Sequence, residues 1–298
     1  MEYYFNRIEN VMRGLIERRR LEKVCLNGTL PDACKELYDS STVIILTGFY
    51  ISNASAAEND GPLGTASLAN ALEKIGKKVV ILTDNNCKEV VDICMKLMKV
   101  KAKLEVVPGI GEDSFYSELL NKYKPTHIVS IERPGRAVDN ECYSMNGIKL
   151  TKYVADCDKL FLRAQELGIV TIAVGDGGNE IGMGNIENDI KRYVKNGEKI
   201  CAKSTCDYLI VAGTSNWGAY ALVSGLSLLS NKNVFHNYYT EIKMLEKVMS
   251  VGGVDGYTGK PSMTVDGIKL SYNIGQVVNF NSIVESYLSL NRINVIEL

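Results

Sequence analysis

The segment GDGGNEIGMGN at 175–185 carries the most distinctive chemistry of the chain, with polar side chains set among glycines. Glycine is kept where the backbone needs φ > 0 or where a ligand approaches closely. A carboxylate held near other carboxylates has a raised pKa, which acid–base chemistry at neutral pH requires. A turn with a helix-capping Asp is the alternative. We expect proton transfer or metal binding by Asp176 and Glu180, and substrate binding by Gly177, Gly178 and Asn179.

A second segment, 47–65, ends in glycines at the start of a predicted helix. The free N–H groups of such a turn bind phosphate or carboxylate, and carboxylates beside it could hold a hard cation. The alternative is that Asp60 only caps the helix ahead of Pro62. The candidates are Glu58 and Asp60 for a metal, and Thr47, Gly61, Gly64 and Thr65 for the substrate.

Two further segments follow predicted strands. ERPGRAVD at 132–139 contains Glu132, a candidate catalytic carboxylate, and two arginines, Arg133 and Arg136, whose planar forks suit a carboxylate or phosphate. A solvated ion-pair loop is the alternative. In GTSNWGAYAL, Ser215 and Asn216 could fix a polar ligand group or simply cap a helix.

Several common catalytic motifs are missing from the sequence. Gly175-x-Gly177 is followed by Glu180 where the dinucleotide motif needs glycine, and no phosphate-binding G-x-x-x-x-G-K-[ST] occurs. We therefore expect no nucleotide cofactor. There is also no G-x-S-x-G motif, which carries the nucleophile of an α/β-hydrolase triad. No C-x-x-C pair, typical of a structural zinc site, occurs either.

Six apolar runs must position these residues. They are rich in β-branched residues and do not alternate, as in strands buried on both faces; they span 43–48, 78–84, 103–108, 126–132, 169–178 and 207–213. Predicted helices lie between them at 62–76, 87–99, 112–123, 151–167 and 217–230. This alternation predicts a doubly wound α/β fold, with a mostly parallel, six-stranded Rossmann-like sheet and helices on both faces.

No linker divides the chain, so we expect a single α/β domain over 1–298. Residues 1–42 are predicted to be a helical decoration of the sheet, and 233–298 a helical or irregular extension. Apolar residues between Phe5 and Ile16 recur at helical spacing and predict a helix that docks on its own domain. The tripeptide V-D-G occurs at 254–256 and 265–267, which is too short to establish a repeat.

Composition narrows the class of protein. With 34 basic and 35 acidic residues in 298, nothing attracts the chain to nucleic acid. No signal peptide and no apolar run long enough to span a bilayer is visible. The eight scattered cysteines are typical of free thiols. We expect a cytoplasmic protein with a small-molecule ligand and no nucleic-acid or membrane partner; the sequence leaves a homo-oligomer open.

Between about residues 43 and 267 the chain resembles the D-glutamate cyclase C-terminal-like domain family. The likeness rests on AENDGPLGTASLANAL, ERPGRAVD, GDGGNEIGMGN, SNWGAYAL and GGVDGYTG. It implies dehydration of a small anionic amino acid, D-glutamate, to 5-oxo-D-proline without ATP, with Mg²⁺ or Mn²⁺ as the candidate cofactor. The chain has DNECYSMNG where the family pattern is D-G-x-Y-x-N-M-R-G, and so lacks a Gly and an Arg.

Ring closure suits the residues singled out above. It needs carboxyl groups that move protons and donors that hold the two substrate carboxylates. Arg133 or Arg136 would hold the α-carboxylate, and N–H groups at 61–65 or 215–216 the other carboxyl group. Two alternatives stay open: another metal-assisted enzyme acting on a small anionic amino or hydroxy acid, and a non-catalytic module that binds a small anion.

Overall fold

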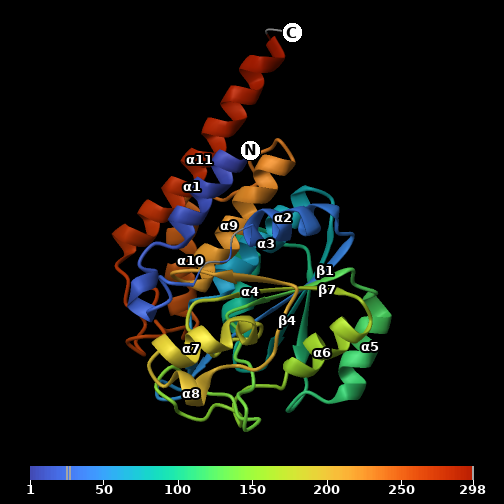
Figure 1. Cartoon of the computed structure of the whole chain (residues 1–298), viewed down its shortest axis with the longest axis vertical. Coiled ribbons are helices and arrows are strands. Elements are labelled where there is room, and N and C mark those ends of the chain that lie inside the picture. The colour runs from blue at the N-terminus through green and yellow to red at the C-terminus, as the bar shows by residue number, and fades with distance from the viewer. Residues whose placement is uncertain (25, 27, 297–298) are drawn as a thin grey trace.

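Six parallel strands form the central sheet in the order β5-β4-β1-β6-β7-β8. The computed structural model describes residues 1–24, 26 and 28–296 (Figure 1). The strands are β1 (Thr42–Thr47), β4 (Lys78–Asp84), β5 (Lys103–Val107), β6 (His127–Ile131), β7 (Val170–Gly175) and β8 (Tyr208–Val211). Counted along the chain this is the order 3-2-1-4-5-6 of the Rossmann fold. The predicted doubly wound α/β fold is therefore confirmed, and all six predicted runs are strands of the sheet.

Both faces of the sheet are buried, as the absence of alternation in the strand sequences predicts. In β1, Val43 and Ile45 belong to one hydrophobic cluster, while Ile44 and Leu46 belong to another on the opposite face. A short antiparallel pair, β2 (Tyr50–Ile51) and β3 (Ala56–Ala57), lies in the loop after β1.

Helices cover each face (Figure 1). One face carries α1 (Glu2–Met12), α2 (Thr29–Asp39), α3 (Pro62–Lys74), α4 (Lys88–Met98), α9 (Ser215–Leu229) and α11 (Leu270–Ile296), with α10 (Tyr238–Ser250) against α4. The other carries α5 (Asp113–Tyr123), α6 (Asp158–Glu166) and the short η1 (Ile16–Arg19), η2 (Met183–Ile186), α7 (Glu187–Tyr193) and α8 (Gly197–Ile200). The helix predicted at 151–167 begins only at Asp158, because turns occupy the residues before it.

The terminal segments are packed into the molecule. Phe5 and Ile8 of α1 are buried in the core beside α9, and α1 lies along α11 (Figure 1). The N–H of Gly213, which follows β8, donates to the carbonyl of Met12, 3.0 Å away. The predicted docking of the N-terminal helix is thus seen in the structure, and it fixes the position of the chain that follows.

Two other findings bear on the sequence predictions. No helix in the described part of the chain is long and apolar enough to cross a membrane. Seven cysteines are free and buried, while Cys25 lies outside the described residues.

The strand order creates a crevice that no single sequence reveals. β1 and β6 are neighbours, with Thr47 in register with Ile131 at their carboxyl ends. From β1 the chain continues to α3 on one face, and from β6 to α6 on the other. In doubly wound sheets such a switch point is where ligands bind.

Candidate functional site

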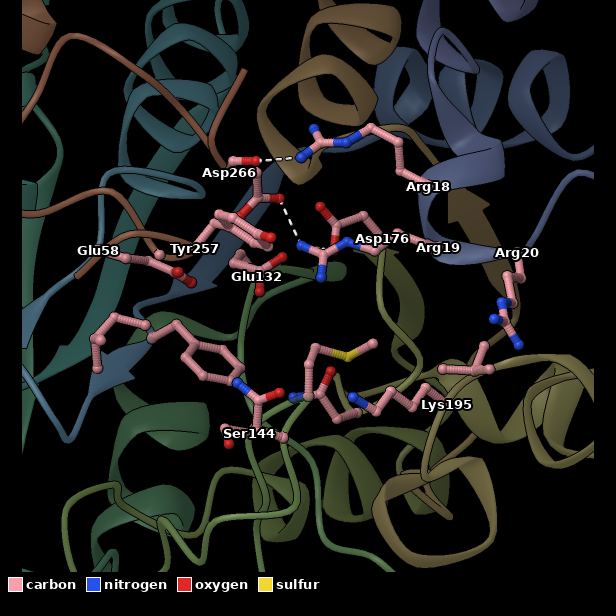
Figure 2. Close-up of a pocket in the computed structure, with 17 residues that line it drawn as sticks. Arg18, Arg19, Arg20, Glu58, Glu132, Ser144, Asp176, Lys195, Tyr257 and Asp266 are labelled. Atoms are coloured by element: carbon pink, nitrogen blue, oxygen red, sulfur yellow. Dashed lines mark hydrogen bonds and ion pairs between the residues drawn. The ribbon is translucent and has the colours of Figure 1, made fainter. Parts of the chain in front are cut away.

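A cavity of about 570 Å³ opens at this edge of the sheet (Figure 2). Its walls carry side chains of both charges: Glu58, Glu132, Asp176 and Asp266, with Arg18, Arg19, Arg20 and Lys195. Buried carboxylates facing several cations in one cavity are typical of a site for a small ligand that has both charges.

Three carboxylates converge at the bottom of the site. Asp60, Glu132 and Asp176 each offer an oxygen, and these atoms all lie within 4.8 Å of one another, with every side chain buried. Glu132 has a φ of 46°, a left-handed conformation that is rare outside glycine. A Cβ on the neighbouring Gly61 would come within 2.8 Å of Glu132 Cβ, so glycine is needed for the close approach.

Burial shifts the pKa values of these carboxyl groups upward. It raises the pKa of Asp60 to about 7, with help from the negative charge of Asp266. Burial also raises the pKa of Glu132 and of Glu58 well above the ordinary range, and the neighbouring carboxylates add to both shifts. The pKa of Asp176 rises for the same first reason, although Arg19 opposes the shift. Near pH 7 the cluster can therefore both donate and accept protons.

Arg19 holds the fourth carboxylate in its ionised form. Its Nη2 lies 2.7 Å from Asp266 Oδ2 and 3.5 Å from Asp176 Oδ1. Burial acts to raise the pKa of Asp266, but Arg19, a hydrogen bond with Asp176 and the charge of Arg18 together outweigh burial, and the pKa falls below its ordinary value. Arg18 Nη2 donates to the carbonyl of Asp266 at 2.7 Å, so both arginines bind one residue of the C-terminal segment (Figure 2).

Glu180, predicted to act with Asp176, binds backbone N–H groups of its own turn. Its carboxylate accepts hydrogen bonds from the N–H groups of Asp176 (3.0 Å), Gly177 (2.7 Å) and Gly178 (2.6 Å), and it does not line the cavity. The N–H groups of Gly177 and Gly178 are likewise used inside the turn. The structure therefore assigns Glu180 to shaping this turn, which presents Asp176 and Asn179 to the cavity.

The two predicted arginines are also engaged elsewhere. The fully buried Arg133 donates to Asp84 at 2.7 Å and to the carbonyls of Gly48 and Ala155. Arg136 pairs with Asp156 at 2.8 Å, and neither arginine lines the cavity. Both arginines tie the loop after β6 to its neighbours, so the structure does not place either of them to hold a ligand in this cavity.

The predicted anion-binding N–H groups are occupied as well. Asp60 accepts from the N–H of Ser215 at 2.9 Å and of Asn216 at 2.8 Å, while Asn216 Oδ1 accepts from Gly61 and Gly64. The starts of α3 and α9 therefore satisfy one another instead of a ligand.

The hydroxyl groups near the site differ in whether they have a hydrogen-bond partner. Ser215 Oγ donates to Glu132 Oε2 at 2.5 Å and so lies beside the three converging carboxylates. The hydroxyls of Thr47 and Thr65 are buried and find no partner among the described residues.

Sequence reasoning missed the contributions of both terminal segments. Arg18–Arg20 come from the predicted N-terminal decoration, and Tyr257 and Asp266 from the C-terminal extension. A signal was present for the latter, because both V-D-G tripeptides lie at the site: Gly256 and Asp266 line the cavity.

The donor set fits a hard divalent cation. Carboxylate oxygens are the ligands that Mg²⁺ and Mn²⁺ prefer. Glu58 Oε1 and Asp176 Oδ2 are buried and lack a hydrogen-bond partner within the described part of the chain, which a cation could supply. Of the residues predicted to bind a metal, Asp60 and Asp176 belong to the converging group, while Glu58 and Glu180 do not and Glu132 takes the third place.

Comparison with known proteins matches the chain to a family. Residues 8–279 match the family model described as "D-glutamate cyclase-like, C-terminal". Over 220 residues the chain is 31% identical to the human protein named "D-glutamate cyclase, mitochondrial", covering 69% of this chain and 36% of that protein. The chain thus spans about a third of the length of this relative. Together, the match over most of the chain and this identity place the protein in the D-glutamate cyclase-like, C-terminal family.

Proposed function

We propose that the protein is a carbon–oxygen lyase that cyclises D-glutamate to 5-oxo-D-proline and water without ATP. The observation that carries the proposal is the buried cluster of Glu132 and Asp176, with raised pKa values, beside Arg19 at the switch point of the sheet. Membership of the family supports the choice of substrate.

The reaction is balanced without any co-reactant. The substrate nitrogen attacks the γ-carboxyl carbon, a new N–C bond forms, and one C–O bond breaks. The ammonium group loses two protons in becoming the lactam N–H, and the departing oxygen gains two in becoming water. The protein must therefore relay protons within one cavity, and the net charge of the substrate does not change.

We assign the donation and the acceptance of protons to different residues of the cluster. Glu132, whose pKa is raised by burial and by the neighbouring carboxylates, donates to the departing oxygen. Asp176, whose Oδ2 has no described partner, accepts from the substrate ammonium group, which favours its ionised form. Folding the substrate so that nitrogen and carbon are in contact supplies a further part of the rate, up to ~7–11 kcal/mol in favourable cases.

Arg19 is the residue we assign to the α-carboxylate. Both of its contacts to Asp266 and Asp176 use Nη2. Guanidinium has five N–H donors in a planar fork, so Arg19 keeps donors for a ligand while it stays fixed by the two acids. This role replaces the one predicted for Arg133 and Arg136.

A cation would be held by Asp60, Glu132 and Asp176, and its charge would make the γ-carboxyl group more electrophilic. Those three residues would then act as ligands. Glu58 lines the same cavity and has a raised pKa, so it remains available to move protons.

The test is incubation of the purified protein with D-glutamate and, separately, L-glutamate, with and without Mn²⁺. We expect 5-oxoproline from the D isomer alone, and its loss in Asp176→Asn and Glu132→Gln. No product from D-glutamate under any condition would overturn the proposal.

One observation favours a second candidate, a related reaction of another small anionic amino or hydroxy acid. Ser144, Met145 and Asn146, from the segment that departs from the family pattern, line the cavity. Asn146 is at the position of the pattern's arginine. Turnover of a neighbouring acid in a small panel, with none of D-glutamate, would select this candidate.

A further inference from the structure

The cavity is larger than free glutamate needs. Its volume of about 570 Å³ lies in the range of roughly 300–1,000 Å³ usual for drug-sized ligands. The catalytic cluster and Arg19 occupy one part of it. In Figure 2, Lys195 and Arg20 lie on the side away from Glu58. Space and side chains therefore remain beyond those that the cyclisation of glutamate uses.

The remaining side chains are suited to a second anion. Arg20 and Lys195 both line the cavity, and neither forms an ion pair with a carboxylate among the described residues. Arg18 and Arg19 are different, because Asp266 accepts from both. Arg20 has a φ of 62°, a left-handed conformation uncommon for arginine, at the end of η1. A ligand carboxylate between Arg20 and Lys195 would find two uncommitted cations.

The reactivity of the substrate's γ-carbon also favours a ligand larger than free glutamate. A γ-carboxylate carries negative charge and resists attack, and the sequence has no phosphate-binding loop with which to activate it. A γ-amide is neutral, so its carbon carries no negative charge that opposes attack. Its leaving group is an amine, which must take up a proton as it departs, and Glu132 lies in the same cavity.

We infer that the site also cyclises γ-D-glutamyl amino acids, with Arg20 and Lys195 binding the carboxylate of the amino acid that leaves. The inference rests on the proposed function, since it uses the same nucleophile and the same acid–base cluster. The α-nitrogen attacks the γ-amide carbon, the N–C bond of the ring forms, and the bond to the leaving nitrogen breaks. Two protons pass from the attacking nitrogen to the leaving one, giving 5-oxo-D-proline and a free amino acid.

The experiment compares γ-D-glutamylglycine with D-glutamine, a γ-amide whose leaving group has no carboxylate. Release of 5-oxoproline is followed for both, and for D-glutamate. We expect kcat/KM to be about tenfold higher for the dipeptide than for D-glutamine, as one ion pair of about 1.4 kcal/mol would give. Lys195→Ala and Arg20→Ala should remove that preference, and Lys195→Arg should keep it.

Lys247→Ala is the matched control, because Lys247 is exposed on α10 and does not line the cavity. It should leave the preference unchanged, and melting curves should show all variants folded. Equal turnover of the two amides, no turnover of the dipeptide, or a preference that survives Lys195→Ala and Arg20→Ala would each overturn the inference. Turnover of the dipeptide without turnover of D-glutamate would support it while refuting the dehydration of glutamate.

Discussion

Asp176 and Glu180, two acidic residues four positions apart, differ in what their side chains contact. Both are buried, and both follow β7 among glycines. Glu180 turns back to accept three backbone N–H groups, while Asp176 faces the cavity with an oxygen that has no described partner. Sequence alone could identify the acidic turn but not this division, because the direction of each side chain depends on the path of the turn.

The different contacts of Asp176 and Glu180 predict that a conservative substitution impairs activity at one residue and stability at the other. Asp176→Asn should abolish turnover of D-glutamate with little change in melting temperature, because it removes a proton acceptor. Glu180→Gln should lower the melting temperature, because hydrogen bonds to a charged acceptor are worth roughly 1.5–3 kcal/mol each. Kinetics and thermal unfolding of both variants provide the check. A fully stable Glu180→Gln protein without activity would return Glu180 to the catalytic role.

Protons and a divalent cation should compete for the cluster. Below its pKa of about 7, Asp60 is protonated in the folded protein, and a cation must displace that proton. We expect Mn²⁺ affinity to rise about tenfold per pH unit towards pH 7, with at least one proton released. Calorimetry in buffers of different ionisation enthalpy measures that release. Identical heats and a pH-independent Kd would contradict this assignment, and Asp60→Asn should bind more weakly.

At the scale of elements, the contact between α3 and α9 positions the acids. Both helices begin at the site, and Asp60 and Asn216 cross-link their first turns. The six strands and four of the five predicted helices were placed closely by apolar patterning, because burial dictates that pattern. The contact between α3 and α9 was not predicted, because these helices follow strands β1 and β8, which are far apart in the sequence.

Gly64 tests that contact. A Cβ at Gly64 would lie 2.8 Å from Ala219 Cβ and 3.0 Å from Asn216 Cα. Gly64→Ala should therefore destabilise the protein by about 1–3 kcal/mol and lower activity by displacing Asp60. Gly275→Ala in α11 is the control, because its Cβ would meet nothing within 4 Å and alanine favours a helix by roughly 0.5–1 kcal/mol. Urea unfolding of the two variants measures the difference; equal stabilities would show that the contact is loose.

At the scale of the whole molecule, the two terminal segments complete the site. The sequence predicted them as decoration because their patterns are those of helices and loops outside the sheet. Their role became visible only in three dimensions, where Arg19 meets Asp266 across 247 positions of the chain. Charge runs such as Arg18–Arg20 are usually solvated, so nothing local marked them as part of a cavity.

The path of the N-terminal segment can be disturbed from a distance. A Cβ at Gly213 would lie 1.9 Å from the carbonyl oxygen of Gly14, just before η1. Gly213→Ala should push this segment outward, raising KM for D-glutamate through Arg19 and costing about 1–3 kcal/mol of stability. Steady-state kinetics beside thermal melting provide the measurement. An unchanged KM in a destabilised variant would show that Arg19 does not bind substrate.

The contact between Arg18 and Asp266, 248 positions apart, also has a consequence for biosynthesis. Asp266 must emerge from the ribosome before its carbonyl can bind Arg18 and its carboxylate can bind Arg19. Until then Asp60, Glu132 and Asp176 can come together, but Arg19, whose positive charge lies beside them, is not held in position by Asp266. Nascent chains should thus lack the fixed arginines of this cavity until Asp266 has emerged.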